Sequence, residues 1–231
     1  MIIGRGLVAN ALANIDDDKY IFYANGISNS VLSQIPGNNF EIKEIEEWVH
    51  KIKDAVFIYF STSQVNAEKN RHRPYVKHKL FIEQFIAAHF PKYLIIRTSN
   101  LVGYNPWNGH TLFNFLYHAL HNDEEIVVDF EAVRNFLDAD HLVRLMVTYF
   151  NYFEINKTIE IVNPDSYTMH QIITEFENYF SRKFKIKTIN SETDFALFEL
   201  DTDLSKQLMK IGNLNFEDHI ESLLKKYYNR T

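Results

Sequence analysis

Met1-Ile2-Ile3-Gly4-Arg5-Gly6-Leu7-Val8-Ala9 opens the chain with a short apolar run, a glycine turn and the start of a helix. In this order Gly4 would permit the tight turn, and Gly6 would let the backbone approach a pyrophosphate. Ala9 stands where a third glycine would allow helix and strand to pack closely. The helix would then direct its N-terminus at the phosphates. The stretch predicts a dinucleotide-binding turn, and the alternative is an ordinary glycine turn.

Residues 19–24 predict a second short strand, which we interpret as the one that ends beside the adenosine ribose of a dinucleotide. No acidic residue follows it to hold the ribose 2′-hydroxyl. Arg5, with polar side chains after the strand, could bind a 2′-phosphate instead. These side chains are Asn25, Ser28, Asn29 and Ser30. We therefore expect NADP(H) rather than NAD(H), the alternative being ordinary turn residues and a solvated arginine.

Two segments, residues 55–60 and 93–97, have the length and composition of parallel strands that are buried on both faces. Ser61-Thr62-Ser63-Gln64-Val65 follows the first and residues 98–104 follow the second. Open α/β sheets bind ligands at the carboxyl ends of their strands, so these polar side chains should gather at one edge. Before the first segment, residues 42–52 show the apolar spacing of an amphipathic helix.

Tyr75 and Lys79 are four residues apart, a spacing that places a phenol and an ammonium on one helix face. A phenol with a pKa near 10 exchanges protons near neutrality if an adjacent cation stabilises the phenolate, and Lys79 could supply that charge. The pair therefore predicts an acid/base site. The alternative is two exposed side chains on a solvated helix face.

Composition excludes several classes of protein. The net charge of −6 leaves no basic patch for a nucleic acid. Without cysteine, thiolate catalysis and cysteine-bound zinc are impossible. His118 and His121 are one turn apart, but no carboxylate completes a metal site, so none is expected. No apolar run is long enough to span a membrane and no signal peptide is evident, which predicts a cytoplasmic protein.

The alternation of short apolar runs with helical periodicity predicts a Rossmann-like, doubly wound parallel sheet with fewer strands than usual. We expect residues 1–104 to form most of the NAD(P)-binding domain. Residues 105–231 would form mainly a small substrate-binding lobe, with at least one strand that returns to the main sheet. Within the lobe, Thr168 and Gln171 predict a capping box at the start of a helix.

In their order, these motifs resemble those of the extended short-chain dehydrogenase/reductases, also called the NAD-dependent epimerase/dehydratase family. The glycine turn, the Ser61–Val65 segment, Tyr75 with Lys79, the Arg97–Gly103 segment and Arg134-Asn135-Phe136 carry the resemblance. It implies that Thr62, Tyr75 and Lys79 are catalytic, and that Lys79 also holds the nicotinamide ribose. It also implies that Asn100 and Arg134 face a nucleotide-sugar substrate. The predicted cofactor-binding residues are Gly4, Arg5, Gly6, Leu7, Val8, Asn25, Ser28, Asn29, Ser30, Ser61 and Lys79.

Departures from the family pattern narrow the expected reaction. The segment before Thr62 is short for the family, so at least one strand–helix unit is missing, and the short segment from Thr62 to Tyr75 predicts an open site. The family's sugar dehydratases have an acidic residue just after the threonine, where this chain has Ser63 and Gln64, which disfavours dehydration. We expect an NADP(H)-dependent ketoreductase. The alternatives are a 4-epimerase or a non-catalytic dinucleotide-binding protein of a polysaccharide pathway.

A homodimer is a further expectation from the resemblance, because family members commonly pair the two corresponding helices across a subunit interface. Apolar side chains are available on both helices, namely Trp48, Leu80, Phe81, Phe85 and Ile86. The same side chains could instead cover the sheet.

Overall fold

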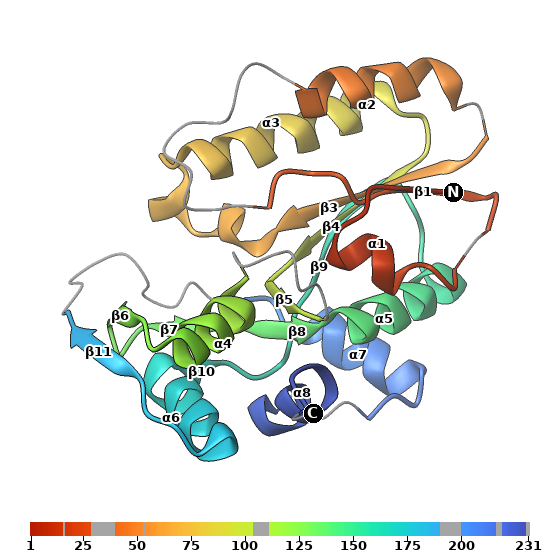
Figure 1. Cartoon of the computed structure of the whole chain (residues 1–231). Coiled ribbons are helices and arrows are strands. Elements are labelled where there is room, and N and C mark those ends of the chain that lie inside the picture. Colours follow the sequence, from red (N-terminus) through yellow and green to blue (C-terminus); the bar gives the residue numbers. More distant parts are fainter. Residues whose placement is uncertain are drawn as a thin grey trace.

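The computed structural model describes residues 1–15, 17–28, 40–52, 54–103, 111–189, 200–215 and 219–229. Within these residues, the main sheet has five parallel strands (Figure 1). In sheet order they are β1 (Ile2–Ile3), β2 (Tyr20–Tyr23), β3 (Val56–Thr62), β4 (Tyr93–Thr98) and β9 (Lys157–Ile161). Each neighbouring pair is parallel. The predicted Rossmann-like α/β class with a shortened sheet is confirmed.

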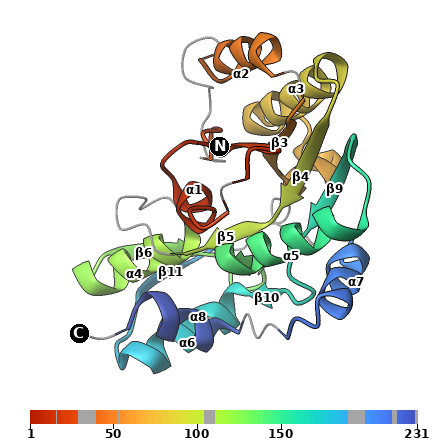
Figure 2. The ribbon, with the colours of Figure 1, turned by 90° about the vertical axis from the view of Figure 1, so that its right-hand side faces the viewer.

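Helices cover both faces of this sheet (Figure 2). One face carries α2 (Phe40–Lys51) and α3 (Pro74–His89), and the other carries α1 (Leu7–Ala11), α5 (Ala139–Tyr152) and α7 (Asp203–Ile211). Phe57 and Tyr59 of β3 pack into the first core, whereas Ile58 and Phe60 pack into the second, as the two-residue period of a strand requires. Because both faces are covered, all of β3 is buried, which explains its continuous apolar run.

The order of the strands shows which part of the standard fold is missing. In a doubly wound dinucleotide fold the first strand lies between the second and the fourth. Here β1 pairs with β2, and β2 lies between β1 and β3. The strand β2 therefore takes the place of the fourth strand, and the described residues contain no strand on the other side of β1. Our interpretation of residues 19–24 as the strand that ends beside the adenosine ribose is wrong.

The missing strands also leave an unusual chain connection. The crossovers from β1 to β2 and from β2 to β3 move in the same direction across the sheet, but α1 and α2 lie on opposite faces. The two connections therefore have opposite hand, although parallel crossovers are almost always right-handed. The order of residues cannot show which neighbour a strand pairs with, so this arrangement was not predicted from the sequence.

The lobe has its own core beside the sheet (Figure 1). Its helices are α4 (Leu112–Asn122), α6 (Met169–Phe180) and α8 (Ile220–Tyr227). Three short strand pairs complete it: β5 (Asn100–Val102) with β8 (Phe136–Asp138), β6 (Glu125–Val128) with β11 (Lys185–Thr188), and β7 (Val133–Arg134) with β10 (Tyr167–Thr168). The predicted capping box of Thr168 and Gln171 begins α6. Among the described helices, none combines the length and apolarity needed to cross a bilayer.

Candidate active site

Thr62 and Tyr75 meet at the carboxyl edge of the sheet. Thr62 is the last residue of β3, and its hydroxyl accepts a hydrogen bond from the Gln64 backbone N–H at 3.3 Å, which starts the 3-10 turn η1 (Ser63–Asn66). A second 3-10 turn, η2 (Glu68–Asn70), leads to α3, which begins at Pro74 because proline suits the first helical position. This places Tyr75 one residue into the helix, where the Thr62 side chain is close enough to influence the pKa of its phenol.

The environment of Tyr75 contradicts one expectation from the sequence. Burial raises the pKa of Tyr75 to about 12, although the Thr62 side chain opposes the rise. The negative charge of Glu41 raises this pKa further. We expected Lys79 to lower it, but the ammonium lies 6.0 Å from the centre of the Tyr75 ring and is directed at other groups. Tyr75 is therefore a protonated phenol at neutral pH.

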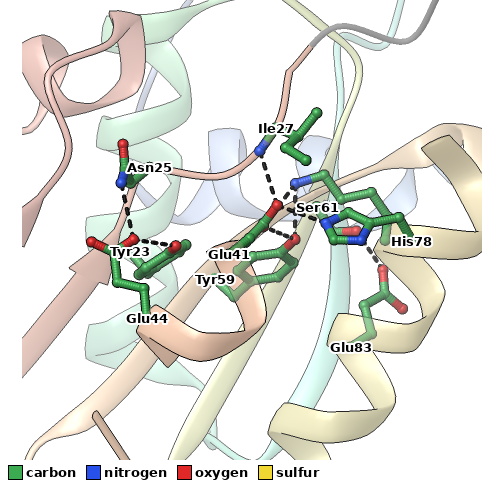
Figure 3. Close-up of polar contacts among 10 residues, drawn as sticks. Tyr23, Asn25, Ile27, Glu41, Glu44, Tyr59, Ser61, His78 and Glu83 are labelled. Atoms are coloured by element: carbon green, nitrogen blue, oxygen red, sulfur yellow. Dashed lines mark hydrogen bonds and ion pairs between the residues drawn. The ribbon is translucent and has the colours of Figure 1, made fainter. Parts of the chain in front are cut away.

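Lys79 belongs to a buried polar cluster centred on Glu41 of α2, and Figure 3 shows the contacts of Glu41 with Tyr59, His78 and Ile27. Its Nζ lies 2.8 Å from the Tyr59 hydroxyl and 3.5 Å from Glu41 Oε1. The Tyr59 hydroxyl in turn donates to Oε1 at 2.7 Å. The other carboxylate oxygen, Oε2, lies 2.8 Å from His78 Nε2 and accepts from the Ile27 backbone N–H at 3.0 Å. We call these five residues the Glu41 cluster.

Charge and burial oppose each other in the Glu41 cluster. Burial would raise the pKa of Glu41, but Lys79, His78, the Ile27 N–H and Tyr59 together lower it to about 2. For Lys79, burial lowers the pKa of the ammonium and outweighs the opposing effect of Glu41 and Glu83. The Lys79 and Glu41 side chains are only 3% and 2% exposed. Glu41 was not predicted from the sequence, although its position four residues before buried Ile45 indicates that it faces inward.

The loop after β2 closes over this cluster. A Cβ at Gly26 would lie 2.8 Å from both Glu41 Oε1 and Lys79 Nζ, so a larger residue here would displace these two side chains. The neighbouring Asn25, a predicted cofactor contact, donates to Glu44 Oε2 at 2.9 Å. Ser28 is exposed, and Asn29 and Ser30 lie outside the described residues. With β2 in the place of the fourth strand, this loop is not beside the expected ribose position, so the 2′-phosphate argument for these side chains fails.

The glycine turn has the form that a dinucleotide needs. Gly4 has φ +125°, and a Cβ there would lie 2.5 Å from the Ala24 carbonyl oxygen, so this position requires glycine. At Gly6 a Cβ would meet no atom within 4 Å, which leaves space for a phosphate to approach the backbone. Arg5 is exposed and Val8 is half-buried, whereas Leu7 packs inward. These residues fit a dinucleotide, and their contacts with one stay a prediction.

Ser61 makes a different contact from the one expected. Its hydroxyl donates to Glu83 Oε1 at 2.5 Å, on the α3 side of β3. Arg97 binds the same carboxylate through Nη2 at 2.6 Å and Nε at 3.1 Å, and reaches Asn66 Oδ1 at 2.7 Å. This second buried ion pair also involves residues that the sequence analysis had not selected, Glu83 and Asn66.

Asn100 and Arg134, the predicted substrate contacts, lie in the strand pairs that lead into the lobe. The Asn100 amide donates to the Asn135 carbonyl at 2.9 Å, so it also holds β5 to β8. Arg134 is half-buried, and burial lowers its pKa to about 10. The charge of Asp129 opposes this shift and that of Arg73, just before α3, adds to it. The charge of Arg134 thus interacts with that of Arg73, the residue that precedes the Tyr75 helix.

The apolar side chains expected to form a dimer interface divide into two groups. Ile86 is fully buried against the sheet, and Trp48, Leu80 and Phe85 are half-buried. Phe81 is 50% exposed and, with Phe40 of α2 at 70%, remains available for a partner. Within the described residues, no group of three or more His, Asp or Glu side chains is arranged to hold a metal ion.

The sequence of residues 42–163, more than half of the chain, matches the family model described as the NAD dependent epimerase/dehydratase family. The chain belongs to this family. The match includes Thr62, Tyr75, Lys79 and Arg134, and it begins after the glycine turn. No curated protein matches the sequence.

Solved structures of similar shape include epimerases and reductases. A UDP-glucuronic acid 4-epimerase from Bacillus cereus, in complex with UDP-glucuronic acid and NAD, is 18% identical with a TM-score of 0.69, over 96% of this chain and 77% of its own. RMD from Pseudomonas aeruginosa, complexed with NADPH, is 13% identical with a TM-score of 0.64, over 90% and 78%. A dTDP-4-dehydrorhamnose reductase from Clostridium acetobutylicum is 15% identical with a TM-score of 0.61, over 91% and 80%. At these identities the likeness shows the fold.

Proposed function

We propose that this protein is an NADP(H)-dependent oxidoreductase that reduces a keto group of a nucleotide sugar, with Tyr75 as the acid. The observation that carries the proposal is that Thr62 and Tyr75 lie close together at the carboxyl edge of the sheet, with Lys79 one helical turn further along α3. Membership of the epimerase/dehydratase family supports a dinucleotide cofactor. Similar structures hold NAD or NADPH, which agrees with a nicotinamide dinucleotide of either kind.

The raised pKa of Tyr75 favours reduction. A ketone that accepts a hydride becomes an alkoxide, and a phenol that keeps its proton at neutral pH is ready to neutralise it. Thr62 would orient the carbonyl oxygen, and Lys79 would hold the ribose hydroxyls beside it. The bound nicotinamide would supply the hydride. An epimerase must first remove a proton with the same tyrosine, which a pKa of about 12 makes harder.

Arg5 supports NADP(H) as the cofactor. It is exposed in the glycine turn, and its guanidinium could bind a 2′-phosphate with two parallel hydrogen bonds. The described sheet lacks the standard second strand, which in this fold ends with the acidic residue that selects NAD. Arg134 and Asn100 are the proposed contacts of the nucleotide-sugar substrate, with the Arg134 fork suited to a diphosphate.

The test is a spectrophotometric assay of NADPH oxidation with a 4-keto nucleotide sugar. We expect stoichiometric oxidation, and Tyr75→Phe should lower kcat about 100- to 10,000-fold because the proton donor is lost. Tyr152→Phe, a change of the same kind at an exposed position, should have no effect. Conversion of a nucleotide sugar with no net NADPH consumption would show the 4-epimerase instead.

The second candidate is a non-catalytic dinucleotide-binding protein, favoured by the burial of Lys79 under the loop at Gly26. It predicts that Tyr75→Phe leaves every activity of the protein intact in the cell, whereas disruption of Gly6 abolishes it. Calorimetry that detects no binding of either NADPH or NADH would reject both candidates.

A further inference from the structure

Lys79 is a cation in a buried site, and its charge is balanced from a neighbouring helix. Its ammonium contacts the Tyr59 hydroxyl of β3 and the Glu41 carboxylate of α2. Taking an ammonium out of water costs several kcal/mol unless an anion and hydrogen-bond acceptors surround it. A buried lysine without such partners releases its proton. The charge of Lys79 therefore depends on groups outside its own helix.

Glu41 has the geometry to supply that support. Its two carboxylate oxygens contact donors from three separate segments of the chain: Tyr59 of β3, His78 and Lys79 of α3, and the Ile27 N–H of the loop after β2. An acceptor with so many partners cannot move without breaking several hydrogen bonds. Glu41 thus fixes the position of the ammonium as well as its charge, and it holds the loop that lies against Lys79.

We propose that Glu41 is the positioning residue for Lys79: it keeps the ammonium charged and fixed one helical turn from Tyr75, so that Lys79 can bind the ribose hydroxyls of the dinucleotide. This inference rests on the proposed function. The titratable groups that face the ammonium are Glu41 of α2, Tyr59 of β3, and Tyr75, His78 and Glu83 of α3. Of these, Glu41 is the carboxylate in direct contact with it.

The first experiment measures the ionisation of Lys79 without any cofactor. Proteins labelled with ¹³C-lysine are titrated by NMR, with Lys79→Met used to assign the Lys79 signal. In Glu41→Gln the Lys79 titration should move to lower pH than in the wild type, and Glu41→Asp, which keeps the charge, should restore most of it. Glu47→Gln is the matched control, because Glu47 pairs with an exposed lysine on the same helix. An unchanged titration in Glu41→Gln would overturn the proposal.

The second experiment is a double-mutant cycle in NADPH affinity, measured by calorimetry. Glu41→Gln and Lys79→Met should each weaken binding about tenfold, the size expected for one charge-assisted hydrogen bond. The double variant should bind no more weakly than Lys79→Met, because Glu41 acts through Lys79. A full additional loss in the double variant would overturn the proposal, since Glu41 would then act on its own.

Two safeguards separate the possible failures. If neither the wild type nor any variant binds a dinucleotide, the proposed function fails, and the NMR titration still tests whether Glu41 keeps Lys79 charged. If Glu41→Gln does not fold, Tyr59→Phe removes the hydroxyl that links the two charges. That variant should also move the Lys79 titration to lower pH, and an unchanged titration there would overturn the proposal.

Discussion

Two ion pairs lie on either side of β3, and they differ in how far their cations are exposed to solvent. Glu41 and Lys79 lie on the β2 side, where the Lys79 side chain is 3% exposed. Glu83 and Arg97 lie on the β4 side, where the Arg97 side chain is 24% exposed and contacts its partner through two nitrogens. Arginine stays charged in any surroundings, whereas a lysine can lose its proton when buried. The positive charge of Lys79 therefore depends on its partner Glu41, whereas Arg97 is charged with or without Glu83.

Removal of the Lys79 cation should produce the largest effect. Lys79→Met leaves Glu41 buried without its counter-ion, which should lower the free energy of unfolding by about 3–5 kcal/mol. Urea denaturation followed by circular dichroism measures it. The control is Lys51→Met, which breaks an exposed ion pair on α2 and should cost less than about 0.5 kcal/mol. Equal losses in the two variants would mean that the buried pair is no different from a surface pair.

The second-largest effect should come from acid, which protonates Glu41 and so weakens the Glu41 cluster. The pKa of Glu41 is about 2 in the folded protein and 4.5 in its ordinary state, so the carboxylate stabilises the fold above pH 4.5. This contribution, about 3 kcal/mol, is lost as the pH falls through 4.5 towards 2. The wild type should therefore lose its stability advantage over Glu41→Gln across that window. A difference that stays constant from pH 7 to pH 3 would contradict the depressed pKa.

Disruption of the second pair should have the smallest effect of the three. In Arg97→Met, Glu83 keeps the hydrogen bond from Ser61, and water can reach the site because Arg97 is partly exposed. We expect a loss of about 1–3 kcal/mol in the free energy of unfolding. NADPH affinity should be unchanged, in contrast to Lys79→Met. A loss of affinity as large as that of Lys79→Met would remove the distinction between the two pairs.

The resemblance to the family predicted that Thr62 and Tyr75 share a site, and local structure explains why they lie close. The apolar run predicted where β3 ends, and in the structure α3 begins at Pro74, so a short connection brings the two side chains to one edge. The environment of Lys79 followed no local rule. Its partner Glu41 lies 38 residues earlier, and their contact depends on how α2 and α3 pack side by side on the sheet.

The strand β2 shows a second limit of prediction from the sequence. Its residues predicted a strand correctly, but the sequence order suggested the wrong neighbour, and with it the wrong place for the loop at Asn25. Strand pairing is a contact between distant segments, and a missing strand changes it without changing the strand's own residues. The expectation that the cofactor is NADP(H) therefore depends on Arg5 and not on that loop.

The sequence by itself determined the class of fold, the positions of the buried strands and the spacing of Tyr75 and Lys79, because hydrophobic periodicity and turn residues act over a few positions. Only the tertiary structure decided the order of strands, the raised pKa of Tyr75 and the ion pair that surrounds Lys79. Those properties depend on burial and on charges brought together from distant segments, and both arise only when the chain has packed.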